Sequence, residues 1–446
     1  MGNSQPSGDE TARGDDGGAT KPSVLLPPPP THHASEDALA DARSAIDAAA
    51  AALDEPGAGR GAPRRSNRPL YYFHPPEKAV YGTVVLFHGF SGEPYGMRWM
   101  ADYFFKAGWN VYSTVLAGHG FKGAGWPTVD LKPSMGGGDA LRIALAGNPE
   151  LAAKLGDTGA LKGNPAAAVE LFEALTDEVP ALAKAGPLYA YMQSLEPGGD
   201  PDAFAARFDS TAADYGAVAE ASLRHVAGLP GPVVTVSSSV GGAAALHAAG
   251  VEGGRVTHVL ACAPLLRVLG DERRQQVLAL GPLGIGPEQG WSPTNRFPLA
   301  CHTAADVFGG SVTTNPAVLQ AFSFRRTKLF MMLTESEDAA HIPTSRAFFS
   351  KIANGAGADV MSGPVGLGGA DGGHILGWYP KSARVPHPMV DPTEVSQNMS
   401  NAYWGSLVQE AHRFFTTGRV EVEHLLSEEP VDELPAPPKS PGRGWP

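Results

Sequence analysis

The sequence has few cysteines, no long apolar run and a shortage of positive charge. Only two of its 446 residues are cysteines, Cys262 and Cys301, so at most one bridge could form and a disulfide framework is excluded. No continuous apolar segment approaches the ~20 residues that span a bilayer. Asp and Glu number 46 against 34 Lys and Arg, which gives a net charge of -12. No block of basic residues offers a surface for nucleic acid, so we predict no nucleic-acid partner.

The two ends of the chain are poor in large apolar residues. No secretory signal is visible, since Val24-Leu25-Leu26 is followed at once by Pro27 to Pro30, and we therefore predict a cytoplasmic protein. Residues 1–66 are rich in Gly, Pro, Ala, Asp and Ser, which predicts a disordered arm. One marginal helix is expected there, at 35–53, with Ser35 as its cap. Residues 428–446 are proline-rich and predict a disordered tail.

Between these ends, residues 67–427 alternate between apolar strands and amphipathic helices. Strands are expected at 71–73, 83–87, 110–116, 233–236, 256–261 and 328–333, with a weaker one at 358–361. Helices are expected after Pro94, at 212–226, after Pro343 and at about 395–415. This alternation predicts an α/β domain with a mostly parallel sheet and helices on both faces.

Two segments interrupt the alternation and predict inserted cap or lid segments. The first, about 121–209, is expected to be helical, with an amphipathic helix that aligns Ala168, Phe172, Leu175, Val179 and Leu182. The second, about 265–326, is rich in Gly and Pro and is expected to be irregular. Its apolar residues between 278 and 291 would pack over the site as a lid, and contact with a lipid surface is the alternative.

One stretch has the pattern of a catalytic turn. Residues 233–247 read Val-Val-Thr-Val-Ser-Ser-Ser-Val-Gly-Gly-Ala-Ala-Ala-Leu-His, which is typical of a strand that turns sharply into a helix. Small residues stand two places before and after Ser239, as a nucleophile elbow requires. The usual elbow is Gly-x-Ser-x-Gly, and here Ser237 replaces the first glycine. We predict that Ser239 is a nucleophile.

A serine nucleophile needs a base and an acid that orients the base. The chain order nucleophile, acid, histidine is typical of α/β-hydrolases, and Ser239, Asp338 and His374 supply it. Asp338 follows the strand at 328–333, at the ligand-binding edge of a parallel sheet. Glu335 and Glu337 are rival acids in the same loop.

The choice of histidine depends on loop geometry. His374 lies in the glycine-rich run 368–376, which can bring an imidazole over the sheet edge without steric obstruction. His341 is the main competitor, but it would have to turn back over its own loop to serve Asp338. His247, inside the helix after the elbow, is expected to be structural.

An acyl-transfer intermediate also needs two donors for its oxyanion. We expect one from the backbone N–H of Val240, directly after the nucleophile, and the other from Phe90 in the turn after the strand at 83–87.

These residues resemble the α/β-hydrolase superfamily, in particular its monoacylglycerol lipase and carboxylesterase branch. The similarity is carried by His88-Gly-Phe-Ser-Gly-Glu-Pro-Tyr-Gly-Met-Arg-Trp-Met, by Lys106-Ala-Gly-Trp-Asn-Val and by Leu116-Ala-Gly-His-Gly. The resemblance implies an eight-stranded type of sheet, no metal or organic cofactor, and hydrolysis of carboxylic esters through an acyl-enzyme. A small ester or a lipid-like molecule would be the substrate. The alternatives are a peptidase or acyltransferase on the same fold, and a catalytically silent protein that binds a ligand or partner.

Overall fold

The computed structural model of the chain describes residues 27–53, 67–120, 125–132, 138–156, 165–179, 201–252, 254–268, 300–324, 326–354 and 373–428. Their centre is a seven-stranded sheet in the order β1-β3-β2-β6-β7-β8-β9. The strands are β1 (Leu70–Tyr72), β2 (Thr83–Phe87), β3 (Asn110–Thr114), β6 (Val233–Ser238), β7 (Val256–Cys262), β8 (Lys328–Thr334) and β9 (Ile375–Tyr379). Every pairing is parallel except that of the edge strand β1 with β3.

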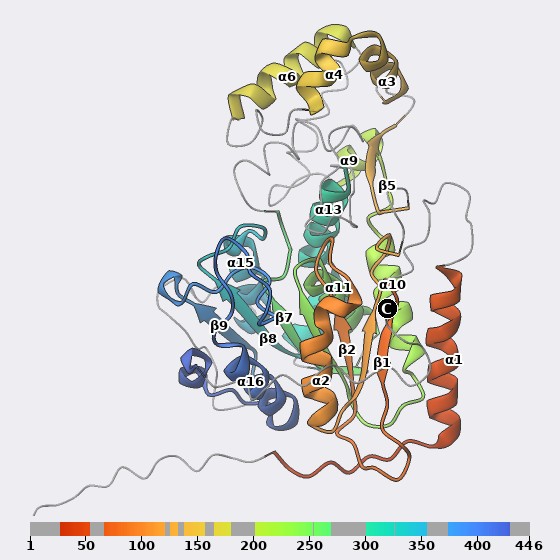
Figure 1. Ribbon diagram of the computed structural model, residues 1–446, viewed down its shortest axis with the longest axis vertical. Helices are drawn as coiled ribbons and strands as arrows, with labels where there is room; N and C mark the ends of the chain where they lie inside the picture. Colours follow the sequence, from red (N-terminus) through yellow and green to blue (C-terminus); the bar gives the residue numbers. More distant parts are fainter. Residues whose placement is uncertain are drawn as a thin grey trace, which may run out of the picture.

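Helices cover both faces of this sheet, so the predicted α/β-hydrolase architecture is confirmed (Figure 1). On one face, α2 (Arg98–Lys106) and α16 (Trp404–Thr417) bury Met100, Phe104, Leu407 and Phe414 against the strands. The other face is covered by α10 (Asp214–His225), α11 (Val240–Val251), α13 (Ala300–Thr314), α14 (Pro316–Ser323) and α15 (Ile342–Asn354). Each strand therefore has apolar neighbours on both sides, which explains the continuous apolar runs in the sequence.

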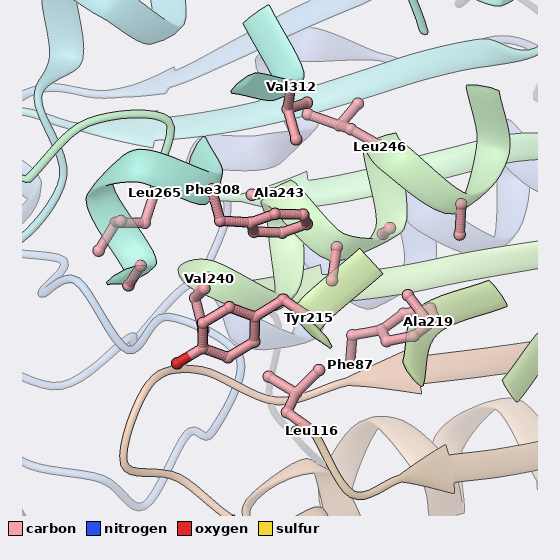
Figure 2. Close-up of a cluster of buried hydrophobic side chains, with 14 of the residues drawn as sticks. Phe87, Leu116, Tyr215, Ala219, Val240, Ala243, Leu246, Leu265, Phe308 and Val312 are labelled. Atoms are coloured by element: carbon pink, nitrogen blue, oxygen red, sulfur yellow. The ribbon is translucent and has the colours of Figure 1, made fainter. Parts of the chain in front are cut away.

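The helix after the elbow lies at the centre of the larger core. Figure 2 shows Val240, Ala243 and Leu246 of α11 packed among Tyr215 of α10 and Phe308 of α13. Most residues of α11 are alanine or glycine, and this lets neighbouring helices approach closely. A Cβ added at Gly250 would lie 2.6 Å from Val318 Cα. The helix that follows the elbow is therefore rigidly packed.

The N-terminal helix lies where the sequence predicts it, with Ser35 as its cap, but it is not marginal. We expected residues 1–66 to be disordered with one marginal helix, but α1 (Glu36–Ala52) is a packed element beside α10 (Figure 1). Ser35 caps it by accepting a hydrogen bond from Ala38 N at 3.1 Å. Leu39 and Ile46 are fully buried, which contributes about 1.5–3 kcal/mol each. Residues 1–26 and 54–66 lie outside the described part, as does the predicted tail from 429 onward.

The first insertion is helical, as expected. It contains β4 (Val129–Leu131), α3 (Gly138–Gly147), α4 (Pro149–Gly156), α6 (Pro165–Glu178), α9 (Pro201–Arg207) and β5 (Phe208–Ser210). The antiparallel pair β4 and β5 forms a stem, and α3, α4 and α6 lie beyond it at the top of Figure 1. Leu171, Leu175 and Val179 are buried along α6 and the residue after it, close to the predicted stripe.

The second predicted insertion is shorter than 265–326. Residues 300–324 were expected to be irregular, but they form α13 and α14, whose Ala304, Ala305 and Val318 pack into the core. The many small residues that looked like loop composition serve close helix packing instead. Residues 269–299, with the predicted lid residues, and the predicted strand at 358–361 lie outside the described part of the chain.

Two boundaries near the C-terminus also differ from prediction. The last helix was expected from about 395, but α16 begins at Trp404, and Gln397 and Asn398 before it adopt left-handed backbone conformations in a turn. The strand β9 was not predicted, since its residues were assigned to the glycine-rich loop around His374. This strand decides where His374 lies.

Candidate active site

Ser239 has the backbone geometry of a nucleophile elbow. It stands between β6 and α11 with φ 56° and ψ -125°, a conformation that a non-glycine residue adopts only under constraint from its surroundings. Two hydrogen bonds supply that constraint, from Ser239 N to Cys262 O at 3.1 Å and from Leu265 N to Ser239 O at 2.9 Å. The fold therefore holds Ser239 in a strained turn at the carboxyl edge of the sheet.

The small residues around Ser239 have separate physical reasons. A Cβ on Gly241 would lie 2.3 Å from His88 O, so no larger residue fits two places after the serine. Ser237 is fully buried in β6, and its hydroxyl donates a hydrogen bond to Leu260 O at 2.9 Å. The serine in place of the usual glycine therefore leaves the sharp turn intact and adds a bond to β7.

The turn after β2 lies directly beside the elbow. A Cβ on Gly89 would be 3.3 Å from Ser239 Cβ, so the backbone of this turn approaches the serine closely. Phe90, the next residue, lines the same cavity as Ser239, and Val240 is the first residue of α11. Phe90 thus shares a cavity with Ser239, and Val240 directly follows Ser239 in the chain.

Two histidines hold this turn in shape. Leu116 N donates to His88 Nε2 at 3.1 Å, so the ring proton is on Nδ1, which donates to Gly89 O at 2.8 Å. Ser91 N donates in the same way to His119 Nε2 at 3.0 Å. The rings of His88 and His119 meet edge to face at 4.8 Å between centroids. Each imidazole links the turn after β2 to the segment after β3.

A cavity of about 550 Å³ opens above Ser239. Most of its lining comes from two segments, His88 to Met97 and residues 387–397. Leu265, Val268 and His302 also line it. The His302 ring lies 4.7 Å from the Phe90 ring between centroids. The cavity is thus bounded by the turn beside the elbow, by α13 and by the chain that follows β9.

Of the three histidines that line this cavity, His88, His302 and His387, the third lies beside a buried carboxylate. The Nδ1 atom of His387 lies 2.6 Å from Glu337 Oε1, and His387 is 9% exposed. The loop that carries it is fixed to the loop after β8, since Thr334 Oγ1 donates to Val385 O at 2.6 Å and Ser336 pairs with Pro386 as a parallel bridge. His387 follows the carboxyl end of β9, on the same sheet edge as Ser239.

Glu337 is held as a buried carboxylate. Its side chain is 2% exposed, and Oε1 accepts backbone hydrogen bonds from Ala339 and Ala340, both at 2.8 Å. Burial alone raises the pKa of this carboxyl, but the charge of His387 and hydrogen bonds from His387, Ala340 and Ala339 outweigh burial, so the pKa lies below its usual value. A carboxylate in this state can fix the orientation of an imidazole.

The structure does not bring His374 to Ser239, and its prediction as the base is wrong. Its Nδ1 accepts a hydrogen bond from Leu329 N at 3.0 Å, and its Nε2 donates to Phe322 O at 2.8 Å. His374 precedes β9 and Leu329 stands at the amino end of β8, whereas Ser239 follows the carboxyl end of β6. These edges of a parallel sheet are separated by about 20 Å, the length of a strand of about six residues.

Asp338, the predicted acid, follows β8 and lines the cavity, but its carboxylate contacts Gln397. Its Oδ2 accepts a hydrogen bond from Gln397 Nε2 at 2.7 Å, while the neighbouring Glu337 contacts the histidine. Glu335 Oε2 accepts from Lys381 N at 2.7 Å. Of the three acidic residues weighed from the sequence, Glu337 is the one beside an imidazole of the cavity.

The other histidines considered from the sequence lie outside the cavity lining. His341 Nδ1 bonds to Thr344 Oγ1 at 2.8 Å within its own helical turn. His247 Nε2 lies 2.9 Å from Glu220 Oε1, between α11 and α10. Sequence reasoning missed His387, although one signal was present. The rule that ligands gather after the carboxyl ends of parallel strands points past Tyr379, once 375–379 is recognised as a strand.

The described residues offer no group of three or more His, Cys, Asp or Glu side chains that could hold a metal ion. Cys262 and Cys301 are both buried free thiols, and burial raises the pKa of each. Across the residues that the structure describes, no helix is long and apolar enough to cross a membrane.

No protein-family model and no curated protein matches the sequence significantly. Among solved structures, a metagenome-derived lipolytic enzyme is 15% identical, covers 79% of this chain and 98% of its own, and has a TM-score of 0.42. Monoglyceride lipase from Saccharomyces cerevisiae is 10% identical over 79% and 92%, with a TM-score of 0.40. Monoacylglycerol lipase from Paleococcus ferrophilus is 11% identical over 78% and 98%, with a TM-score of 0.39. At these identities and TM-scores, the likenesses carry no argument about activity, which depends on the site itself.

Proposed function

We propose that the chain is a serine hydrolase that cleaves carboxylic esters through an acyl-enzyme, with Ser239 as nucleophile, His387 as base and Glu337 as the acid that orients the base. The observation that carries this proposal is the strained elbow at Ser239 in one cavity with His387, whose Nδ1 lies 2.6 Å from a buried carboxylate. The chain order is still nucleophile, acid, histidine.

The proposed reaction follows from these positions. Because Nδ1 of His387 faces Glu337, Nε2 is the nitrogen that takes the proton of the Ser239 hydroxyl as Oγ attacks the ester carbonyl. The carbonyl oxygen gains negative charge, which the backbone N–H groups of Phe90 and Val240 would stabilise. The tetrahedral intermediate collapses, the C–O bond to the alcohol breaks, and the alcohol leaves with the proton from His387. Water then attacks the acyl-enzyme with His387 again as base, which releases the acid and restores Ser239.

The strain at Ser239 supports an enzyme over a silent binding protein. A positive φ at a serine costs about 1–3 kcal/mol, and such strain clusters at active sites, which favours an enzyme. Peptidase and acyltransferase activities use the same groups and are separated from esterase activity by substrate choice.

The test is turnover of short-chain p-nitrophenyl esters and of amino-acid anilides by the full chain and by Ser239→Ala. We expect ester turnover that Ser239→Ala abolishes, with little cleavage of anilides. Ser311→Ala, which alters a serine of α13 outside the cavity lining, is the matched control and should retain activity. Ester turnover that survives in Ser239→Ala would remove Ser239 as nucleophile. Preferential cleavage of anilides would instead make the chain a peptidase.

A further inference from the structure

The wall of the cavity that carries His387 continues into a short turn at the cavity mouth. We call residues 394–399 the flap. Glu394, Val395, Ser396 and Gln397 of the flap line the cavity together with His387 and Pro388. One continuous segment therefore provides both the proposed base and the surface that a bound substrate would meet next to it.

The flap is a closed turn. Ser396 N donates to Met399 O at 3.0 Å, and Met399 N donates to Ser396 O at 2.9 Å. The two residues between them, Gln397 and Asn398, have φ 52° and 59°. A two-residue turn with both central residues left-handed is the tight hairpin turn. Gln397 is an unusual residue for such a position, where Asn, Asp and Gly are preferred, so its side chain has a reason to be there.

That side chain ties the flap to the loop after β8. Gln397 Nε2 donates to Asp338 Oδ2 at 2.7 Å, and Asp338 is adjacent in sequence to Glu337. A second tie joins the flap to the turn after β9, where the Arg384 guanidinium donates to Asn398 O at 3.1 Å. The preceding residues are fixed to α2, since Arg98 pairs with Asp391 at 2.9 Å. The flap is thus tied at Gln397 and Asn398, and the chain before it is tied at Asp391. Gln397 and Asp338 both line the cavity.

The flap presents an apolar side chain to the cavity. Val395 is 68% exposed and lines the cavity. Covering an exposed valine with another apolar group removes apolar surface from water, which is favourable. The charged side chains of the described lining are those of Glu93, Asp338 and Glu394, and that described lining includes no lysine or arginine. A negatively charged group on the substrate would be repelled there, whereas an uncharged apolar group would cover Val395.

We propose that the flap determines substrate selectivity: Val395 binds an uncharged apolar acyl or alcohol group of the ester, and the hydrogen bond between Gln397 and Asp338 holds Val395 in position. This inference rests on the proposed ester hydrolysis and names its substrate class. Asp338 thus acts as a positioning residue through Gln397, and not as the acid of the catalytic site.

The test compares kcat/KM for p-nitrophenyl hexanoate with kcat/KM for the acetate and for an ester whose acyl chain ends in a carboxylate. We expect the wild-type chain to favour the hexanoate over both. Val395→Ala should lower the hexanoate-to-acetate ratio by about tenfold, since removal of methyl groups from an apolar contact has effects of that order. Gln397→Ala should lower the ratio by about fivefold, the factor that corresponds to one net hydrogen bond. Asp338→Asn keeps an acceptor for Gln397 and should preserve the ratio.

The matched control is Val251→Ala, which truncates an exposed valine at the end of α11, outside the cavity lining. It should leave the ratio unchanged. A ratio that stays within twofold of wild type in both Val395→Ala and Gln397→Ala would overturn the role of the flap, as would a preference for the carboxylate-terminated ester. Labelling of wild-type Ser239 by a fluorophosphonate distinguishes a failure of the flap proposal from a failure of the proposed ester hydrolysis. A labelled chain with an unmoved ratio refutes the flap alone, and an unlabelled chain without ester turnover refutes the proposed function and the flap together.

Discussion

Replacing Glu337 by glutamine tests the acid of the proposed triad at a single oxygen-to-nitrogen change. In the structure, Oε1 of Glu337 accepts hydrogen bonds from the backbone N–H groups of Ala339 and Ala340 and lies 2.6 Å from His387 Nδ1. A glutamine keeps the volume of the side chain and one carbonyl oxygen, but it removes the negative charge that stabilises the protonated imidazole. The amide nitrogen can also present a hydrogen to His387, which would select the wrong tautomer.

The size of the effect follows from that geometry. Loss of the equivalent carboxylate charge in a serine triad lowers kcat by about 10⁴ while the positions of the other residues stay intact. At about 1.36 kcal/mol per tenfold change, this corresponds to a barrier about 5 kcal/mol higher. The effect should be close to this value because the Glu337 side chain is only 2% exposed, so water cannot replace the missing charge.

The assay is kcat for p-nitrophenyl acetate at neutral pH, with Asp338→Asn as the matched control. Asp338 is the adjacent carboxylate, and its hydrogen bond to Gln397 survives in the asparagine variant. We expect Glu337→Gln to lose about four orders of magnitude and Asp338→Asn to stay within about fivefold of wild type. A larger loss in Asp338→Asn than in Glu337→Gln would refute the assignment and would restore the acid predicted from the sequence.

Further predictions concern stability and pH. His374→Ala removes two buried hydrogen bonds and should lower the free energy of unfolding in urea by about 1–3 kcal/mol. Fluorophosphonate labelling of Ser239 should persist in this variant. Loss of labelling in a folded variant would contradict this. Ser237→Gly should destabilise by about 1 kcal/mol without a gain in kcat, and a faster enzyme would be the contrary result. Leu39→Ala should lower the free energy of unfolding in urea by about 2–5 kcal/mol. An unchanged free energy of unfolding would contradict the packing of α1. The pKa of Glu337 is lowered in the fold, so its ionised carboxylate stabilises the fold at pH values above the usual carboxyl pKa. The difference in free energy of unfolding between wild type and Glu337→Gln should therefore shrink as the pH falls through the native pKa of Glu337. A difference that grows as the pH falls would contradict this.

The framework of the sheet could be predicted because its signals are local. The runs at 83–87, 110–116 and 328–333 are rich in apolar residues, as is typical of strands buried on both faces, and each forms a strand within a residue or two of the predicted bounds. Ser239 was also recognisable from nearby residues, since the elbow needs small neighbours within two positions. The insertion at 121–209 broke the alternation visibly enough to be recognised as helical.

The proposed base could not be found in the same way, because its position depends on which end of a strand lies at the edge of the sheet that carries Ser239. The strand β9 reads Ile-Leu-Gly-Trp-Tyr, with a glycine at its centre and a glycine-rich run before it, so it resembled a loop. Once 375–379 is a strand, His374 belongs to the amino edge of the sheet and His387 to the carboxyl edge. The choice between Glu337 and Asp338 is finer still, since adjacent residues have the same chemistry and only the direction of each side chain distinguishes them.

The N-terminal helix shows a limit of composition. Residues 36–52 are mostly alanine and acidic residues, which predicts a marginal helix with a weak apolar face. Leu39, Ala42, Ile46 and Ala50 nevertheless lie on one face and are all buried. Packing of that narrow face against the rest of the chain stabilises the helix, and sequence alone does not reveal the partner surface.

The most direct test of the proposed catalytic site is mass spectrometry of the peptide that a fluorophosphonate labels, in the wild-type chain, in His387→Ala and in His374→Ala. The account predicts a label on Ser239 in the wild-type chain, a labelling rate that falls by orders of magnitude in His387→Ala, and a rate close to wild type in His374→Ala. A label on another residue, or fast labelling that survives in His387→Ala and disappears in His374→Ala, would contradict it.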